Sequence, residues 1–486
     1  DIPLAVFQNL EKIDDWRLVL YDNSVQNPPK EIISQGKEAI SRYFESYLID
    51  NQEVKVILLG NTTAGKTSLV EYLLDKTYPP ECSTHGISLK TWQPEDTKFL
   101  ASMWDFGGQE YYHATHKLFL TNNAIYLVLW DKGKNKSDLL DTDIYTSENV
   151  LESKKLQHFH YEYWLKLIRK GFAPDSPIIT VQNKIEISGK EVIAQRLINQ
   201  YKIKEQYHIS LAETHKGTKQ FKRKYDDFEE DLKDFIAEYI KKQAPESAEA
   251  GQIQRYIDSI RKSLREDWKE DYLLFETFKE RAIEVAQKEG DKMDDLDIKI
   301  TLRYLHDTGV LLYFGYGETM QNSKLKEYVF INPNYVTGTI YEILDGNAQK
   351  NGGKFDFEYV KEKLNQNEKE ANLFIDLMQS PNFELVFKHK ENYYASQFLP
   401  KENTIINYQK KSLDYAFSLR FPNYFSPSFI TRFISRYAER SDEEAFCRTG
   451  IILKQDKIDF YVFANIEKGE ITVKVSENGK KDRFIR

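Results

Sequence analysis

The chain has 486 residues, of which 41% are hydrophobic and 30% are charged, and its formal net charge is −8. This length exceeds what one hydrophobic core usually serves, so we expect two to four folded domains and not a disordered chain. The negative charge argues against nucleic acid as the main partner, and the longest apolar runs, such as Val54–Leu59, are too short to cross a membrane.

Cysteine usage and the absence of a visible signal peptide bear on the compartment. The two cysteines, Cys82 and Cys447, are far apart in the sequence and fit no metal-ligand spacing. We interpret both as free thiols in a reducing environment. A cytoplasmic location without membrane insertion is therefore expected.

Residues 1–49 are predicted to hold the end of a leucine-rich repeat region and a linker helix over about 31–48. Leu18, Leu20 and Asn23 have the L-x-L-x-x-N spacing of such a repeat, in which Asn closes a backbone turn. One repeat cannot bury its own hydrophobic face, so this would be the last unit or cap of a larger array. An ordinary strand followed by an Asp-Asn turn gives the same pattern, and that alternative stays open.

Residues 50–243 alternate between strand and helix patterns, which predicts a mostly parallel, doubly wound α/β domain. Leu69, Leu73 and Leu74 share one face of the first predicted helix. The polar segment 132–155 is longer than an ordinary connection and is predicted to be a surface insertion. The predicted strands are 54–59, 99–104, 124–130, 177–182 and 206–210, and a charged helix is predicted over about 221–242.

Two further units are predicted beyond a linker-like stretch at 241–252. Residues 252–393 begin with helices and continue with an apolar hairpin, which suggests a winged-helix-like unit. Residues 394–486 contain mainly strand patterns with one helix near 427–437, which indicates a small α+β unit. Within residues 252–393, helices are predicted around 252–289, 295–307 and 333–344, and the predicted hairpin pairs 309–314 with 327–331.

The strongest motif is the phosphate-binding loop Gly60-Asn61-Thr62-Thr63-Ala64-Gly65-Lys66-Thr67-Ser68, which fits G-x-x-x-x-G-K-[ST]. It follows an apolar strand directly and opens a helix, which is the context that the motif requires. We expect the loop amides and the helix N-terminus to face nucleotide phosphates. Lys66 would reach the β- and γ-phosphates, and the Thr67 hydroxyl would bind Mg²⁺.

A D-x-x-G motif ends the next predicted strand of the sequence. Asp105 would hold Mg²⁺ through a water molecule, and the amide of Gly107 or Gly108 would sense the γ-phosphate. Thr84 lies between the two motifs and offers the hydroxyl that closes on Mg²⁺ when the γ-phosphate is present. A loop threonine at such a place can also be incidental.

Candidate catalytic residues follow from the same motif. Gln109 stands where Ras-like proteins orient the attacking water, so Gln109 and Lys66 are the predicted catalytic pair. His113 is the alternative for the water-orienting role. Packing on a switch helix is the favoured interpretation of both His113 and His116.

The base-reading motif is Asn183-Lys184-x-Glu186, in which Glu stands where Asp is expected. Glu keeps both acceptors for guanine N1 and N2, but its extra carbon predicts an affinity weaker by about 1 kcal/mol. It gives no reason to prefer adenine, although a solvent-facing Glu186 remains the alternative. Ser210 and Leu211 end the last predicted strand, where a backbone amide usually meets guanine O6.

These motifs, taken in order, resemble a Roc domain, the Ras-like GTPase of the Roco family. The segment WDFGGQEYYHATHKLFL, which contains Phe119, is more specific than a generic small GTPase. Downstream, TGVLLYF and YVFINPNYVTGTIYEIL resemble the first half of a COR domain, and LRFPNYFSPSFITRFISRY and CRTGIILK resemble its second half. Because no kinase sequence is present, the chain looks closer to bacterial and archaeal members.

The resemblance implies a Ras-like P-loop fold followed by an α+β COR domain with a winged-helix-like first half. It also implies Mg²⁺-dependent conversion of GTP and water to GDP and phosphate, loose nucleotide binding, homodimerisation through the COR region and an unidentified downstream protein partner. Two alternatives remain open. One is a nucleotide-binding dimerisation scaffold with negligible hydrolysis, and the other is a P-loop ATPase of another class.

Slow intrinsic turnover is predicted from what surrounds the loop. No arginine occurs between Arg42 and Arg169, and Thr62 and Thr63 crowd the space through which an arginine finger would approach. Asn61 is the only candidate for a potassium-assisted route. Aromatic residues of the last unit are interpreted as core or dimer interface, namely Phe421, Tyr424 and Phe425.

Overall fold

The computed structural model describes most of the chain after residue 52. The described residues are 36, 38–40, 53–79, 87–108, 119–120, 123–145, 151–243, 252–290, 292–315, 324–344, 350–380, 383–400, 415–421, 428–441, 445–455, 458–465 and 468–475. Several sequence predictions fall outside these ranges: the repeat residues Leu18, Leu20 and Asn23, and also Cys82, Thr84, Gln109, His113, His116, Tyr424 and Phe425.

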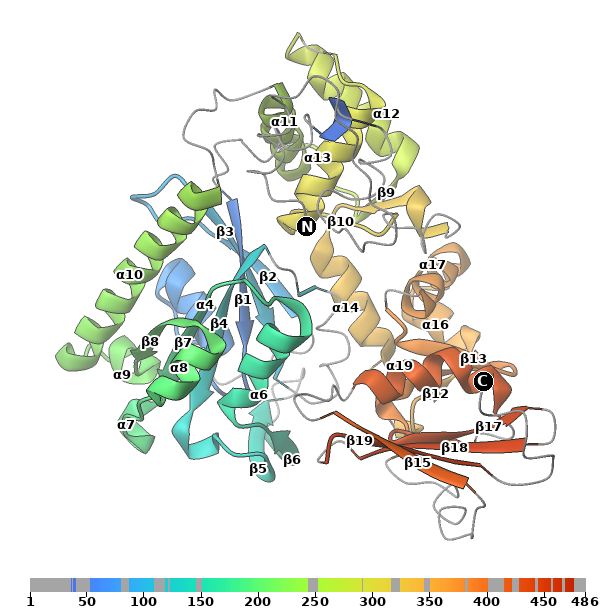
Figure 1. Cartoon of the computed structure of the whole chain (residues 1–486). Coiled ribbons are helices and arrows are strands. Elements are labelled where there is room, and N and C mark those ends of the chain that lie inside the picture. The colour runs from blue at the N-terminus through green and yellow to red at the C-terminus, as the bar shows by residue number, and fades with distance from the viewer. Residues whose placement is uncertain are drawn as a thin grey trace. The chain divides into compact units, whose positions relative to one another are not determined.

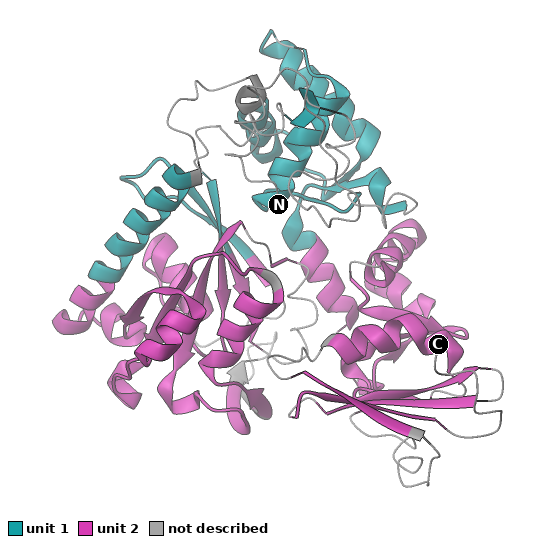
Figure 2. Cartoon of the chain, in the orientation of Figure 1, with its two compact units in different colours: residues 1–55, 89–103, 226–335 teal, residues 56–88, 104–225, 336–486 magenta. Residues whose placement is uncertain are grey.

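The chain divides into two compact units, and each unit is assembled from three separated stretches (Figure 2). The first unit comprises residues 1–55, 89–103 and 226–335. The second comprises residues 56–88, 104–225 and 336–486. All the described residues of the predicted nucleotide site belong to the second unit.

A six-stranded sheet with the order β2-β3-β1-β4-β7-β8 provides the scaffold for that site. β4 pairs in parallel with β7, and β7 pairs in parallel with β8, which confirms the mostly parallel α/β fold. Figure 1 shows the strands enclosed between helices. The strands are β1 (Glu53–Leu59), β2 (Ile87–Trp92), β3 (Leu100–Phe106), β4 (Ala124–Asp131), β7 (Ile178–Asn183) and β8 (Ile203–His208).

The central strands were predicted close to their observed bounds, whereas one edge strand was missed and the other was predicted with shifted bounds. Every residue of β1 is buried, because a strand covered on both faces of a parallel sheet reads as a continuous apolar run. β2 was missed, and the predicted 206–210 strand begins three residues earlier, at Ile203, in the structure. Both are edge strands with polar, partly exposed residues, so neither carries that signal.

Helices and a hairpin connect these strands. The segment predicted as a surface insertion folds as an antiparallel pair, β5 (Asp138–Tyr145) and β6 (Leu151–His158), preceded by the 3₁₀ turn η2 (Lys132–Lys134). Phe119 is buried and lies against Trp104 with ring centroids 5.5 Å apart. The helices are α4 (Lys66–Asp75), α6 (Tyr161–Lys166), α7 (Ile185–Ser188), α8 (Gln195–Tyr201), α9 (Leu211–His215) and α10 (Lys219–Gln243), and a π-helical segment, η3 (Leu167–Phe172), follows α6.

The first unit contains the helices and wing that the sequence suggested. Three helices pack around Ile257, Phe278 and Leu305 and against a three-stranded antiparallel sheet of order β10-β11-β9. The third strand, β9, precedes the predicted hairpin and was not anticipated. The elements are α11 (Gln252–Glu266), β9 (Tyr272–Leu274), α12 (Phe275–Lys288), α13 (Asp295–Asp307), β10 (Leu312–Tyr313) and β11 (Tyr328–Phe330).

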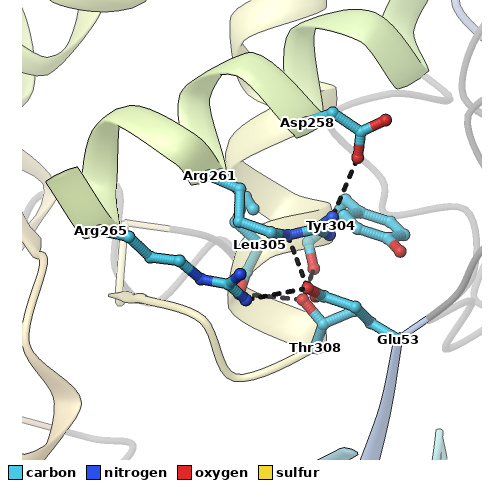
Figure 3. A network of polar contacts seen from close by, with 7 residues as sticks. All are labelled: Glu53, Asp258, Arg261, Arg265, Tyr304, Leu305 and Thr308. Atoms are coloured by element: carbon cyan, nitrogen blue, oxygen red, sulfur yellow. Dashed lines mark hydrogen bonds and ion pairs between the residues drawn. The ribbon is translucent and has the colours of Figure 1, made fainter. Parts of the chain in front are cut away.

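A buried ion pair holds the first residue of β1 within the first unit (Figure 3). The Arg261 Nε lies 2.6 Å from the Glu53 carboxylate, and Arg265, one turn later on α11, lies 3.9 Å from it. Asp258 also contacts Arg261, at 3.0 Å. Burial raises the pKa of Glu53, while the two arginines oppose this shift.

The second unit ends in two antiparallel sheets, of orders β12-β14-β13 and β15-β19-β18-β17-β16. Ile430 and Ile434 of α19 pack with Ile451 and Val462, and Phe421 adds to this core. Cys447 is a buried free thiol. The elements are α14 (Pro333–Leu344), β12 (Lys354–Phe355), α16 (Phe357–Lys363), α17 (Glu368–Gln379), β13 (Val386–His389), β14 (Asn392–Ala395), β15 (Tyr415–Arg420), α19 (Ser428–Tyr437), β16 (Phe446–Cys447), β17 (Gly450–Gln455), β18 (Ile458–Asn465) and β19 (Glu470–Val475).

No helix in the described ranges is both long and apolar enough to cross a membrane.

Candidate nucleotide-binding site

The phosphate loop is the turn between β1 and α4, and two glycines make its path possible. Gly60 has φ 148°, and a Cβ there would lie 2.0 Å from the carbonyl oxygen of Leu129 in β4. Gly65 has φ 95°, and a Cβ there would lie 2.3 Å from the side-chain Nδ2 of Asn183. Only glycine combines this backbone conformation with such close approach. The loop therefore lies directly against β4 and the base-reading motif.

Lys66 lies in this loop with its ammonium group buried. Its Nζ donates to the carbonyl oxygens of Gly60 and Asn61, both at 2.9 Å. Burial lowers the pKa of Lys66 to about 8, and the Asp105 carboxylate opposes this shift. A bound phosphate would supply negative charge at this place and favour the charged lysine.

Thr67 and Asp105 form the part of the site suited to a metal ion. The Thr67 hydroxyl donates to Asp105 Oδ2 at 2.5 Å, which joins the first turn of α4 to the end of β3. A hydroxyl and a carboxylate are hard oxygen ligands that fit Mg²⁺, whose other ligands would come from phosphate and water. The described residues contain no cluster of three or more His, Cys, Asp or Glu side chains suited to a metal. Ser68 follows in α4 and is partly buried.

The glycine of D-x-x-G touches the phosphate loop. A Cβ on Gly108 would lie 2.1 Å from the backbone nitrogen of Thr62 and 2.4 Å from the carbonyl carbon of Asn61. Gly107 is also buried. The motif therefore needs glycine at position 108 because the loop backbone occupies the space of a side chain.

Asn183 ties the base-reading motif to the rest of the site. It is buried, its Nδ2 donates to the carbonyl oxygen of Ala64 at 3.1 Å, and its Oδ1 accepts from the Leu211 amide at 3.1 Å. One side chain thus connects the end of β7, the phosphate loop and the start of α9. The three segments predicted to contact the nucleotide are brought together at one end of the sheet, where such sheets bind ligands.

The remaining base-reading residues lie on α7 and α9. Lys184 precedes α7 with φ 60°. Glu186 is partly exposed, but its Oε2 is buried and has no hydrogen-bond partner among the described residues. The Ser210 hydroxyl accepts from the Glu213 amide at 3.2 Å and so caps α9. Of these side chains, Glu186 offers the acceptor that the structure leaves unused.

Sequence reasoning missed a second set of contacts, made by the segments that flank the hairpin. The Asn61 amide donates to the Phe159 carbonyl oxygen at 2.7 Å, and the Phe159 amide donates to Asn61 Oδ1 at 3.0 Å. The Lys134 ammonium donates to the Thr63 hydroxyl at 3.0 Å. The position of Asn61 in the loop was visible in the sequence, but nothing local pointed to partners so distant in the chain. Asn61 thus holds the hairpin, and its role as a candidate for a potassium-assisted route stays a prediction.

Arg169, the first arginine after Arg42 in the sequence, binds main-chain carbonyl oxygens of the same unit. Its guanidinium donates to the carbonyl oxygens of Tyr201 and Ser176, both at 2.6 Å, and of Pro174 at 2.9 Å. These contacts join η3 to the strand and helix ends beside it.

Two family models match the chain. Residues 55–186 match the Ras of Complex, Roc, domain of DAPkinase, and residues 255–413 match the C-terminal of Roc, COR-A domain. Together they cover the phosphate loop, D-x-x-G, the base-reading motif and most of the region between the linker and β15.

Curated relatives and a solved structure share this arrangement. A Roc-COR-CHAT protease from an unknown prokaryotic organism is 25% identical over 425 residues, which cover 79% of this chain and 35% of that protein. Another, from Runella zeae, is 22% identical over 441 residues, which cover 84% of this chain and 42% of that protein. The chain thus spans less than half the length of these relatives.

The solved structure is Methanosarcina barkeri Roco2 RocCORdC bound to GDP. It is 26% identical with a TM-score of 0.51, and the match covers 72% of this chain and 96% of that one. Family models, relatives and structure agree on the order of domains. The chain therefore belongs to the Roco family, in its prokaryotic form, and carries a Roc domain of the Ras-like GTPase class followed by a COR domain.

Proposed function

We propose that this chain is a guanine-nucleotide switch that hydrolyses GTP to GDP and phosphate and forms homodimers through its COR region. The observation that carries the guanine assignment is the buried Oε2 of Glu186, which has no hydrogen-bond partner among the described residues and follows Asn183 by three residues in the base-reading motif. The GDP-bound Roco2 neighbour supports the same base. Guanine N1 and N2 would supply the two donors that such a carboxylate accepts.

Hydrolysis would proceed by in-line attack of water on the γ-phosphate. Lys66 and the loop amides would bind and neutralise the phosphates, and Gln109 would orient the water. Thr67 and Thr84 would bind Mg²⁺ directly and Asp105 would hold it through a water molecule, and the bound ion would offset charge on the β- and γ-phosphates. Turnover would be slow because Arg169, the nearest following arginine, is engaged with carbonyl oxygens.

Competition between GDP and ADP tests the base assignment. The native protein is expected to prefer GDP, because adenine lacks the N1 proton and presents its amino group where guanine has O6. Equal affinities would favour a P-loop ATPase of another class. Glu186→Gln should weaken GDP binding more than ADP binding, since only guanine pairs with the carboxylate.

Single-turnover release of phosphate from GTP tests the catalytic assignment. The native protein should release phosphate slowly but measurably, and Gln109→Ala should be slower. Gln195→Ala is a matched control, since Gln195 is exposed at the start of α8. Negligible release by the native protein would favour the alternative of a nucleotide-binding dimerisation scaffold.

Oligomer mass in GDP and in a non-hydrolysable GTP analogue tests the coupling to assembly. A switch predicts a dimer whose stability differs between the two nucleotides, because a ligand shifts an equilibrium only by its differential affinity for the two states. A monomer in both conditions would contradict the dimerisation part of the proposal.

A further inference from the structure

We propose that Lys134 is a second phosphate-binding cation of the nucleotide site, acting beside Lys66; this inference rests on the proposed nucleotide binding. The Lys134 ammonium donates to the hydroxyl of Thr63 at 3.0 Å. Thr63 lies within the phosphate loop and has φ 64°, so the loop turns sharply at this residue. A lysine from outside the motif thereby places its charge on the loop that receives the phosphates.

The backbone around Lys134 is held in place by the loop itself. Asp131, the last residue of β4, accepts from the Gly133 amide at 2.9 Å and caps the 3₁₀ turn that carries Lys134. Asn61 contacts the Lys134 carbonyl oxygen at 3.4 Å and makes two bonds to the backbone of Phe159. Because both ends of the hairpin are fixed to the loop, the lysine needs little further ordering to meet a ligand.

A buried imidazole, His158, ends the hairpin that follows Lys134. His158 is fully buried, its Nε2 contacts the Thr142 hydroxyl at 2.8 Å, and its Nδ1 has no partner among the described residues. Burial lowers the pKa of His158 to about 4, and Lys134 and, less strongly, Lys66 lower it further, while Asp131 opposes them. His158 is therefore neutral near pH 7, so this buried ring adds no positive charge beside the hairpin that follows Lys134.

The location of Thr63 indicates which phosphates Lys134 would meet. Loop amides of this motif cradle the α- and β-phosphates, while the motif lysine reaches toward the β- and γ-phosphates. A side chain on Thr63 is therefore expected to contact the phosphates that GDP and GTP share. Lysine suits this role as a point charge that needs no fixed bidentate geometry.

Lys134→Gln tests the inference, because glutamine keeps a hydrogen-bond donor for Thr63 and removes the charge. We expect the dissociation constants of GDP and of a non-hydrolysable GTP analogue both to rise about tenfold. This is the rise expected when one partly exposed, charge-assisted hydrogen bond to phosphate is lost. Lys134→Arg should stay close to native. The matched control is Lys132→Gln, which removes the same charge from an exposed residue of the same turn and should leave both affinities unchanged.

Salt dependence separates phosphate binding from a structural role. Removing a lysine that binds phosphate should flatten the dependence of affinity on salt concentration, since one ionic contact is lost. A native salt dependence in Lys134→Gln, with a lower melting temperature of the nucleotide-free protein, would overturn the inference. Equal affinities of native and Lys134→Gln proteins for GDP would overturn it as well.

The same variants distinguish this inference from the proposed function. If the native protein prefers ADP, the guanine assignment fails, but Lys134→Gln should still weaken ADP and inorganic pyrophosphate binding about tenfold. If the native protein prefers GDP and Lys134→Gln binds it equally well, the proposed function stands and Lys134 is excluded. If no nucleotide or pyrophosphate binds, both are refuted.

Discussion

Replacing Asn183 by alanine should separate the parts of the nucleotide site. The side chain is 2% exposed and makes two hydrogen bonds of 3.1 Å, one to the Ala64 carbonyl oxygen and one from the Leu211 amide. Asn183→Ala leaves both main-chain groups without their partner. Since an unsatisfied buried polar group costs about 1–3 kcal/mol, the total for the two groups is about 2–6 kcal/mol.

We expect most of this loss to appear in nucleotide affinity. In the nucleotide-free protein, the phosphate loop and the start of α9 can move apart and recover hydrogen bonds from water, whereas a bound nucleotide needs both in place. A loss of about 3 kcal/mol corresponds to an affinity for GDP roughly 100-fold weaker. Fluorescent GDP titration measures this change, and urea unfolding of the nucleotide-free protein measures the part that affects stability.

Two further variants make the test sharp. Asn199→Ala is the control, because Asn199 lies exposed on α8 and its Oδ1 accepts a single exposed bond, from Gln195 at 3.0 Å. Asn183→Asp keeps the acceptor for Leu211 but sets a carboxylate oxygen against the Ala64 carbonyl, so it should bind GDP at least as poorly as the alanine variant. Native GDP affinity and native stability in Asn183→Ala would refute the reasoning.

Three other changes have expected outcomes. Burial lowers the pKa of Lys55 to about 7 from 10.5, with Asp307 opposing, so the unfolded chain binds more protons between these pH values. The free energy of unfolding should therefore rise with pH above 7, and Lys55→Met should lower this slope by up to about 1.4 kcal/mol per pH unit in urea titrations; an unchanged slope would contradict the assignment. Arg261→Met should destabilise by about 3 kcal/mol, since it leaves Glu53 buried beside a more distant arginine, and adding Glu53→Gln should recover most of the loss. An Arg261→Met protein as stable as the native protein would contradict a stabilising role of the ion pair. Gly65→Ala should abolish GDP binding, because the added Cβ would lie 2.3 Å from the side-chain nitrogen of Asn183 and would push that side chain away. Retained GDP binding would show that the loop adapts to the alanine.

Local sequence was enough to determine the central part of the site. The phosphate loop and D-x-x-G each occupy consecutive residues at the end of a buried strand, so their chemistry is visible without tertiary information. The strands that carry them are covered on both faces and read as apolar runs, as β1 does. The order of motifs then indicated the Ras-like class and the COR region after it.

Tertiary structure decided which side chains far apart in the sequence form hydrogen bonds with one another. Asn61 and Phe159 are 98 residues apart, and Lys134 and Thr63 are 71 apart, yet both pairs join the hairpin to the phosphate loop. A polar insertion gives no local signal of the loop it will contact, because hydrogen-bond partners are chosen by folding of the sheet. For the same reason, the edge strand β2, the third strand β9 of the wing and the assembly of each unit from separated stretches needed the structure. The sequence by itself contained the phosphate-loop, D-x-x-G and base-reading motifs of a Roc domain, and the fold decided which distant side chains contact the phosphate loop.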